Sequence, residues 1–211
     1  MMRSRDQRPE VQKGKWECQI ECCDFRKFLP TLHDVDLILC DPPYAREYLD
    51  LFEPLSKLAA ECLAPRGMLA VLYGQSNLPE LYDALRTHLD YRWTMAMAMP
   101  GDAPTVFHKR VRPQWKPLLI FMRPGAKPVR WIYSDLINPA KVAKDLHPWQ
   151  QEEGGIRRAV ELLSQPNDLV VDCFLGTGTT GVAALETGRR FAGCDVDRKA
   201  VLITRKRLGL V

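Results

Sequence analysis

Residues 169–181 read LVVDCFLGTGTTG, a short apolar run that leads into a glycine-rich turn. The run Leu169–Asp172 predicts a buried strand, and the segment Thr179–Thr187 behind the turn predicts a helix. Glycines let a backbone turn tightly and approach a ligand, and the free N–H groups of a first helical turn favour an anionic group. Asp195 ends the next predicted strand, where an acid can bind a pair of ribose hydroxyls. The stretch therefore indicates a ligand site of the nucleotide-binding kind.

The same glycines fit the dinucleotide pattern G-x-G-x-x-G, through Gly176, Gly178 and Gly181. A dinucleotide fold needs a second mononucleotide half, and only 30 residues follow Gly181. A second half would have to lie upstream, which implies a permuted order of elements. The position of the turn therefore argues against a nicotinamide enzyme.

Strand and helix patterns alternate along the rest of the chain. The predicted strands are Trp16–Glu21, Val35–Cys40, Gly67–Tyr73, Tyr91–Met99, Lys116–Met122, Leu169–Asp172 and Phe191–Asp195. The predicted helices are Phe25–Leu32, Leu49–Leu63, Leu78–Leu89, Gly155–Leu163, Thr179–Thr187 and Arg198–Leu208. This alternation predicts an α/β fold with a mostly parallel sheet and helices on both of its faces. Ligands of such sheets bind at the carboxyl ends of the strands.

A second motif, Asp41-Pro42-Pro43-Tyr44, follows the apolar strand VDLILC at residues 35–40. Two prolines end the strand in a stiff loop. The Asp41 carboxylate and the Pro42 carbonyl could accept both N–H groups of a planar exocyclic amine and localise its lone pair. Tyr44 could stack on a base drawn out of its duplex. The plainer interpretation is a stiff loop in which Asp41 caps a helix.

Together the two motifs resemble the beta class of amino-methyltransferases that use S-adenosylmethionine on DNA, in which the catalytic block precedes the cofactor block. The similarity runs from about Trp16 to Leu208. It implies a Rossmann-like methyltransferase fold with a seven-stranded, mostly parallel sheet in permuted order. It also places Asp41 and Gly176 on adjacent strand ends.

The resemblance implies a role for individual residues. The catalytic loop would be Asp41, Pro42, Pro43 and Tyr44. Asp24 would face the adenine of the cofactor, and Asp195 would bind the ribose. Phe174 would pack on the cofactor. His147 begins HPWQ, which is similar to a family segment whose usual Lys-Pro is Gln151-Glu152 here. The full set of implied cofactor contacts is Asp24, His147, Asp172, Phe174, Gly176, Thr177, Gly178, Thr179, Thr180 and Asp195.

Positive charge gathers between Gly101 and Trp131, where seven basic residues oppose one acid for a net +6, more than the +4 of the whole chain. Phe107 lies within this stretch. Basic side chains neutralise phosphates, and aromatic ones stack or wedge between bases. The alternative for any one residue is a solvated loop or a core aromatic. The candidate DNA contacts are Lys109, Arg110, Arg112, Trp115, Lys127 and Arg130.

The composition limits the classes of protein to which the chain can belong. The chain has 211 residues, 46% of them hydrophobic and 27% charged, as in a globular protein with one core. No apolar run approaches the roughly 20 residues that span a bilayer, and the N-terminus lacks a signal-peptide core. We therefore expect a cytoplasmic protein with reduced thiols and no membrane partner. The cysteines Cys18, Cys22 and Cys23 lack zinc-site spacing, so we expect no metal.

Residues 1–15 read as a flexible tail, and residues 16–211 as a single methyltransferase domain. Within it, 16–122 would be the catalytic half, 123–147 a short DNA-recognition segment and 148–211 the cofactor-binding half. One small domain that faces a palindromic site can form a homodimer.

The function that these motifs predict is site-specific methylation of adenine N6 in double-stranded DNA, as in restriction–modification systems, with S-adenosylmethionine as cofactor and a flipped base as substrate. Cytosine N4 is the nearest alternative, although a Ser at position 41 is more typical of that target in the resembling family. RNA remains a possible substrate. A protein-glutamine enzyme would usually carry Asn at position 41, and a catalytically inactive DNA-binding relative would keep the fold without turnover.

Overall fold

The structure is a computed structural model that describes residues 18–99, 105–128, 131–138 and 148–211, except for the side chains of His108 and of residues 148–153. Three sequence predictions therefore fall outside the described residues: the tail at 1–15, the cofactor contact His147 and the DNA contact Arg130.

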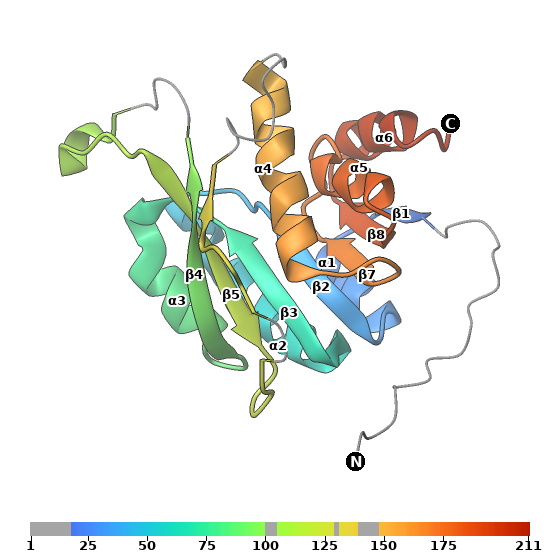
Figure 1. Cartoon of the computed structure of the whole chain (residues 1–211), viewed down its shortest axis with the longest axis horizontal. Helices are drawn as coiled ribbons and strands as arrows, with labels where there is room; N and C mark the ends of the chain where they lie inside the picture. Colours follow the sequence, from blue (N-terminus) through green and yellow to red (C-terminus); the bar gives the residue numbers. More distant parts are fainter. Residues whose placement is uncertain (1–17, 100–104, 129–130, 139–147) are drawn as a thin grey trace.

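The described strands form one sheet in the order β1-β8-β7-β2-β3-β5-β4-β6 (Figure 1). Their bounds are β1 Cys18–Cys22, β2 Val35–Cys40, β3 Leu63–Leu72, β4 Asp90–Ala98, β5 Trp115–Met122, β6 Leu136–Ile137, β7 Leu169–Asp172 and β8 Arg190–Asp195. All seven strands predicted from the sequence are present. The eighth, β6, is a two-residue strand inside the segment 123–147, which showed no strand pattern. It lies against β4, where the Ala96 N–H donates to the Asp135 carbonyl at 2.7 Å.

The sheet is mostly parallel, as predicted. The pairs β1–β8, β8–β7, β7–β2, β2–β3 and β4–β6 are parallel, and β5 runs antiparallel to both β3 and β4. The strands β1, β8, β7, β2 and β3 therefore all end at one end of the sheet, called here the carboxyl end. Since Ala98, the last residue of β4, pairs with Trp115, the first residue of β5, the connection between these strands lies at this same end.

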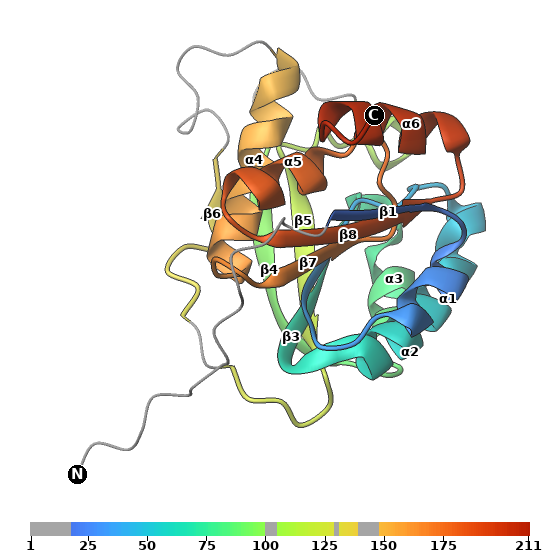
Figure 2. The ribbon, with the colours of Figure 1, turned by 90° about the vertical axis from the view of Figure 1, so that its right-hand side faces the viewer.

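Helices cover both faces of the sheet (Figure 2). One face carries α1 (Phe25–Phe28), α2 (Phe52–Cys62) and α3 (Leu78–Leu85), and the other carries α4 (Pro148–Leu163), α5 (Thr179–Glu186) and α6 (Arg198–Arg207). Short 3₁₀ turns lie at Leu29–Thr31, Arg46–Leu51, Gln75–Asn77 and Phe107–Lys109.

Strand β2 shows why the apolar runs are continuous. Ile38 and Cys40 pack into the core beneath α2, whereas Leu37 and Leu39 pack into the core beneath α4 and α5. A strand that is buried on both faces needs apolar residues at successive positions. No helix in the described part of the chain is long and apolar enough to cross a membrane.

Candidate catalytic and cofactor site

The glycine-rich turn lies between β7 and α5 at the carboxyl end of the sheet. Gly176 and Gly178 have φ of +49° and +81°, a left-handed conformation that side chains disfavour. A Cβ on Gly178 would lie 2.7 Å from Cγ2 of Thr204, so the close approach of α6 also requires glycine. The Thr204 hydroxyl donates to the Gly176 carbonyl at 3.3 Å. The turn is therefore held in place from α6, while Gly176 and Thr177 stay exposed.

Asp195 ends β8 and fixes the other side of the turn. Its two carboxylate oxygens accept the N–H of Gly176 at 3.0 Å and the N–H of Asp197 at 2.9 Å. Its neighbour in the sheet, Cys22 at the end of β1, leads directly to Asp24. Asp24 caps α1 by accepting the Arg26 N–H at 2.8 Å. Both acids implied by the resemblance thus lie at the carboxyl end of the sheet, beside the turn.

Three acids end neighbouring strands: Asp41 follows β2, Asp172 ends β7 and Asp195 ends β8. Burial raises the pKa of Asp172, whereas hydrogen bonds from the Phe174 N–H and the Thr180 side chain lower it. Burial has the larger effect, and the pKa is raised to about 7. The charges of Asp41 and Asp195, which lie at the ends of the neighbouring strands, also raise the pKa of Asp172. A pKa of about 7 leaves Asp172 partly protonated at neutral pH.

The remaining predicted cofactor residues lie around the same turn. Phe174 packs against Phe25 of α1, with ring centroids 5.6 Å apart. The Thr177 carbonyl accepts a hydrogen bond from Arg207 at 2.6 Å. Thr179 begins α5, and Thr180 is buried beside Asp172.

The loop Asp41–Tyr44 begins where β2 ends. Since Ile38 pairs with Val171, this loop and the glycine-rich turn leave adjacent parallel strands at the same end. Pro42 is buried, whereas Asp41 and Pro43 are exposed. The Tyr44 hydroxyl donates to Oδ1 of Asp41. Lys116 places its Nζ 5.2 Å from the centroid of the Tyr44 ring. The structure thus joins the two sequence motifs in one site and does not show Asp41 as a helix cap.

Two residues that the sequence analysis missed hold this loop. The Tyr73 hydroxyl and the Asn77 amide both donate to the Tyr44 carbonyl, at 3.2 and 3.3 Å. The Tyr73 ring also meets the Tyr44 ring edge-on, with centroids 5.0 Å apart. A signal for Tyr73 existed, because it ends the predicted strand Gly67–Tyr73, whose carboxyl end falls beside that of β2.

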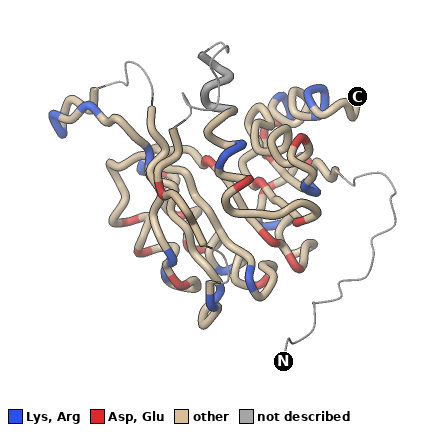
Figure 3. Tube along the Cα trace, in the orientation of Figure 1, with Lys and Arg blue, Asp and Glu red and all other residues tan. Residues whose placement is uncertain are grey.

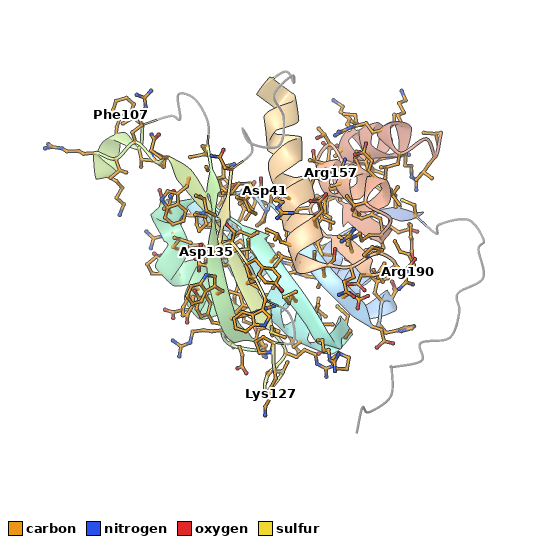
Figure 4. All side chains as sticks on the ribbon, in the orientation of Figure 1. Asp41, Phe107, Lys127, Asp135, Arg157 and Arg190 are labelled. Atoms are coloured by element: carbon orange, nitrogen blue, oxygen red, sulfur yellow. The ribbon has the colours of Figure 1, made fainter. Side chains whose placement is uncertain are left out.

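The basic residues fall into two groups. Lys109, Arg110 and Arg112 are exposed on a hairpin between β4 and β5, at the carboxyl end of the sheet (Figure 3). Trp115 begins β5 and accepts a hydrogen bond from the Gln75 side chain on its carbonyl at 2.6 Å. Lys127 lies at the opposite end of the molecule from Phe107 on the hairpin (Figure 4). The structure therefore does not bring Lys127 together with the other predicted DNA contacts.

Solved structures share this architecture. The chain matches the M1.HpyAVI–SAM complex with a TM-score of 0.71 and 24% identity, over 91% of this chain and 99% of the other. It matches the cytosine-N4-specific PvuII DNA methyltransferase with a TM-score of 0.71 and 19% identity, over 90% of this chain and 86% of the other. Fold and site together define an α/β domain of the DNA methyltransferase type.

A family model described as DNA methylase, of the N6/N4 type, matches residues 35–206. The chain belongs to this DNA methylase family. Among curated relatives, the Type II methyltransferase M1.MboII of Moraxella bovis is 43% identical over 61 residues, which is 29% of this chain and 24% of that protein. The matched stretch thus spans about a quarter of the relative's length.

Proposed function

We propose that the protein transfers a methyl group from S-adenosylmethionine to adenine N6 in double-stranded DNA. The observation that carries the proposal is the placement of the Asp41–Tyr44 loop beside the glycine-rich turn, at adjacent strand ends of a DNA methylase fold. One motif can hold an exocyclic amine, and the other can hold the methyl donor.

S-adenosylmethionine supplies a methyl group on a positively charged sulfur, and the residues of the site fit it. Asp24 and Asp195 would hold its adenosine, Phe174 would pack on it, and the turn from Gly176 to Thr180 would hold its methionine end. The carboxyl groups of Asp41 and Asp195, which follow β2 and end β8, suit a ligand that carries sulfonium and ammonium cations.

The chain's own part in the reaction is to hold and orient the amine. Asp41 accepts one N–H of the adenine amine, and the Pro42 carbonyl accepts the other. In the structure the Tyr44 hydroxyl donates to Asp41, so the incoming amine replaces a donor that is already present. No strong base would be needed before attack, because the methyl–sulfur bond would break as the N–C bond forms and the amine proton would leave to solvent only afterwards. Rate enhancement comes from proximity and orientation.

Adenine is favoured over cytosine by the residue at position 41. Ser is more typical of cytosine-N4 enzymes in the resembling family, and this chain has Asp41. The fold does not separate the two targets, since the PvuII enzyme, named as cytosine-N4-specific, matches with a TM-score of 0.71. Cytosine N4 is therefore the second candidate target.

The relatives also suggest a setting. M1.MboII is named a Type II methyltransferase, and we infer that this protein likewise marks specific DNA sites in a restriction–modification context. The proposed partner is duplex DNA in the cytoplasm, and homodimerisation on a palindromic site stays a prediction.

Nucleoside mass spectrometry on unmethylated duplex DNA, incubated with the protein and S-adenosylmethionine, tests the proposal. We expect N6-methyladenine from the unmutated protein and from Glu61→Ala, which removes an exposed acid of α2, and none from Asp41→Ala. N4-methylcytosine would keep the chemistry and change the base. Absence of any methylated nucleoside would reject duplex DNA as substrate and favour RNA or an inactive DNA-binding relative.

A further inference from the structure

The connection between β4 and β5 closes into a narrow hairpin through a bridge between Val106 and Val111. Phe107 lies just inside this bridge, at the start of the 3₁₀ turn Phe107–Lys109, and 85% of its surface is exposed. The turn ends at Arg110, which has the left-handed conformation with φ +53°. A large apolar ring is thus held out in water on a short, hydrogen-bonded projection, away from both cores (Figure 4).

The charge of the hairpin defines the partner that it suits. Lys109, Arg110 and Arg112 are exposed on the same hairpin, and residues 105–114 contain no acid. An exposed aromatic ring on a basic hairpin matches a polyanion that also offers flat apolar surfaces, which is the chemistry of stacked bases between phosphates.

The base of the hairpin is fixed to the end of the sheet that carries the proposed site. The Met99 N–H donates to the Gln114 carbonyl at 2.9 Å, and the Gln75 side chain donates to the Trp115 carbonyl at 2.6 Å. Gln75 and Asn77 belong to the same 3₁₀ turn, and Asn77 holds the Tyr44 carbonyl. One short turn therefore supports both the hairpin and the Asp41–Tyr44 loop.

We propose that Phe107 is a wedge that enters the DNA base stack next to the target base, while Lys109 and Arg110 bind the flanking phosphates. The inference rests on the proposed function and adds the step that delivers the base to Asp41. Extruding a base costs a few kcal/mol of stacking and pairing, and an apolar side chain that fills the opened step offsets part of this cost.

The test compares Phe107→Ala with Leu202→Ala, which removes another exposed apolar side chain, 49% exposed, from α6. Single-turnover methylation is measured on a duplex whose methylation site has been mapped by sequencing of modified DNA. We expect Phe107→Ala to slow methylation about 10- to 100-fold, since each 1.4 kcal/mol of lost support is tenfold in rate, and Leu202→Ala to match the unmutated protein.

A second duplex separates a wedge from a structural role. Placing an abasic site opposite the target base removes the pairing cost, so Phe107→Ala should then methylate within about threefold of the unmutated protein, because unpaired bases are cheapest to extrude. Phe107→Trp should keep most of the activity on the paired duplex.

Three results would overturn the wedge. The first is Phe107→Ala as active as Leu202→Ala on paired DNA, and the second is a loss that persists undiminished on the abasic duplex. The third is failure of the unmutated protein to methylate any DNA, which would reject the proposed function itself and is distinguished from the others by the unmutated control.

Discussion

Asp172 lies between the charges of Asp41 and Asp195, and its pKa of about 7 lies above the ordinary value of 3.8. The folded state therefore holds the proton more tightly than the unfolded chain does. The contribution of Asp172 to stability is complete below about pH 4 and is lost as the pH rises toward 7, by up to about 1.4 kcal/mol per pH unit.

Asp172→Asn should abolish this part of the pH dependence, because an amide stays neutral. Urea unfolding of both proteins at pH 5 and pH 8 measures the effect. The unmutated protein should lose more unfolding free energy between these pH values than Asp172→Asn does, and parallel losses in the two proteins would contradict the assignment.

The Tyr44 carbonyl gives a second prediction. Tyr73→Phe and Asn77→Ala each remove a donor to this carbonyl, and a hydrogen bond is worth about 0.5–1.5 kcal/mol. We expect kcat to fall about 2- to 10-fold in each variant and further in the double variant, with an unchanged Kd for S-adenosylmethionine.

Tyr91→Phe is the matched control, because the exposed Tyr91 hydroxyl bonds to the Thr94 hydroxyl at 2.9 Å, away from the loop. A fall in kcat equal to that of the control would mean that the Tyr73 hydroxyl does not position the loop.

At the scale of single residues, the sequence predicted which side chains of one motif lie together. Asp41 and Tyr44 are neighbours in the chain, so their cooperation could be predicted. Tyr73 and Asn77 lie about 30 positions further on, |i−j| of 29 and 33 from Tyr44, and reach it only after β2 and β3 have paired. Local patterns place Tyr73 at the end of a strand, but they do not show which residue it contacts.

The glycine-rich turn can be tested as an element. Gly178 and Gly188 have similar φ, +81° and +75°, but a Cβ on Gly178 would meet Thr204 at 2.7 Å, whereas a Cβ on Gly188 would meet nothing within 4 Å. Gly188→Ala therefore carries backbone strain alone, about 1–2 kcal/mol.

We expect Gly178→Ala to lose more stability than Gly188→Ala and to weaken binding of S-adenosylmethionine at least tenfold, while Gly188→Ala leaves binding intact. Thermal unfolding and titration calorimetry measure the two effects. Equal cofactor affinity in both variants would show that the shape of the turn at Gly178 does not matter for binding.

Elements with a clear burial pattern were predicted, and those without one were not. Strand β2 is apolar throughout because both faces are buried. Strand β6 has only two residues, which is too few to show a period of two. Helix α4 begins at Pro148, whereas the sequence predicted a start at Gly155. The prediction missed the first turns because they are polar and contain Gly154 and Gly155. Helix α2 begins at Phe52 because residues 46–51 form a 3₁₀ turn.

At the scale of the whole molecule, we expect DNA to bind at the carboxyl end of the sheet and not at the opposite end. Strand β5 has 8 residues, so at about 3.3 Å per residue it carries the chain about 25 Å from the hairpin to the loop of Lys127. The sequence grouped Lys127 with Lys109 because the two are close in number. A strand between them places them at opposite ends of the sheet.

Salt dependence of DNA binding tests this polarity. Each phosphate contact that is removed lowers the slope of log K against log salt by about 1. Lys109→Ala and Arg110→Ala should each reduce the slope, and Lys127→Ala should leave it unchanged. Equal reductions from all three variants would instead mean that DNA contacts both ends of the molecule.

The strand order has one more consequence. Strands β7 and β8 come late in the chain, yet they are inserted between β1 and β2. Strands β1 and β2, from the N-terminal part of the described chain, thus flank β8 and β7 from the C-terminal part. Removal of either part would leave unpaired strands inside the sheet. We therefore expect catalytic and cofactor halves to melt as one cooperative unit, with a calorimetric enthalpy equal to the van't Hoff enthalpy.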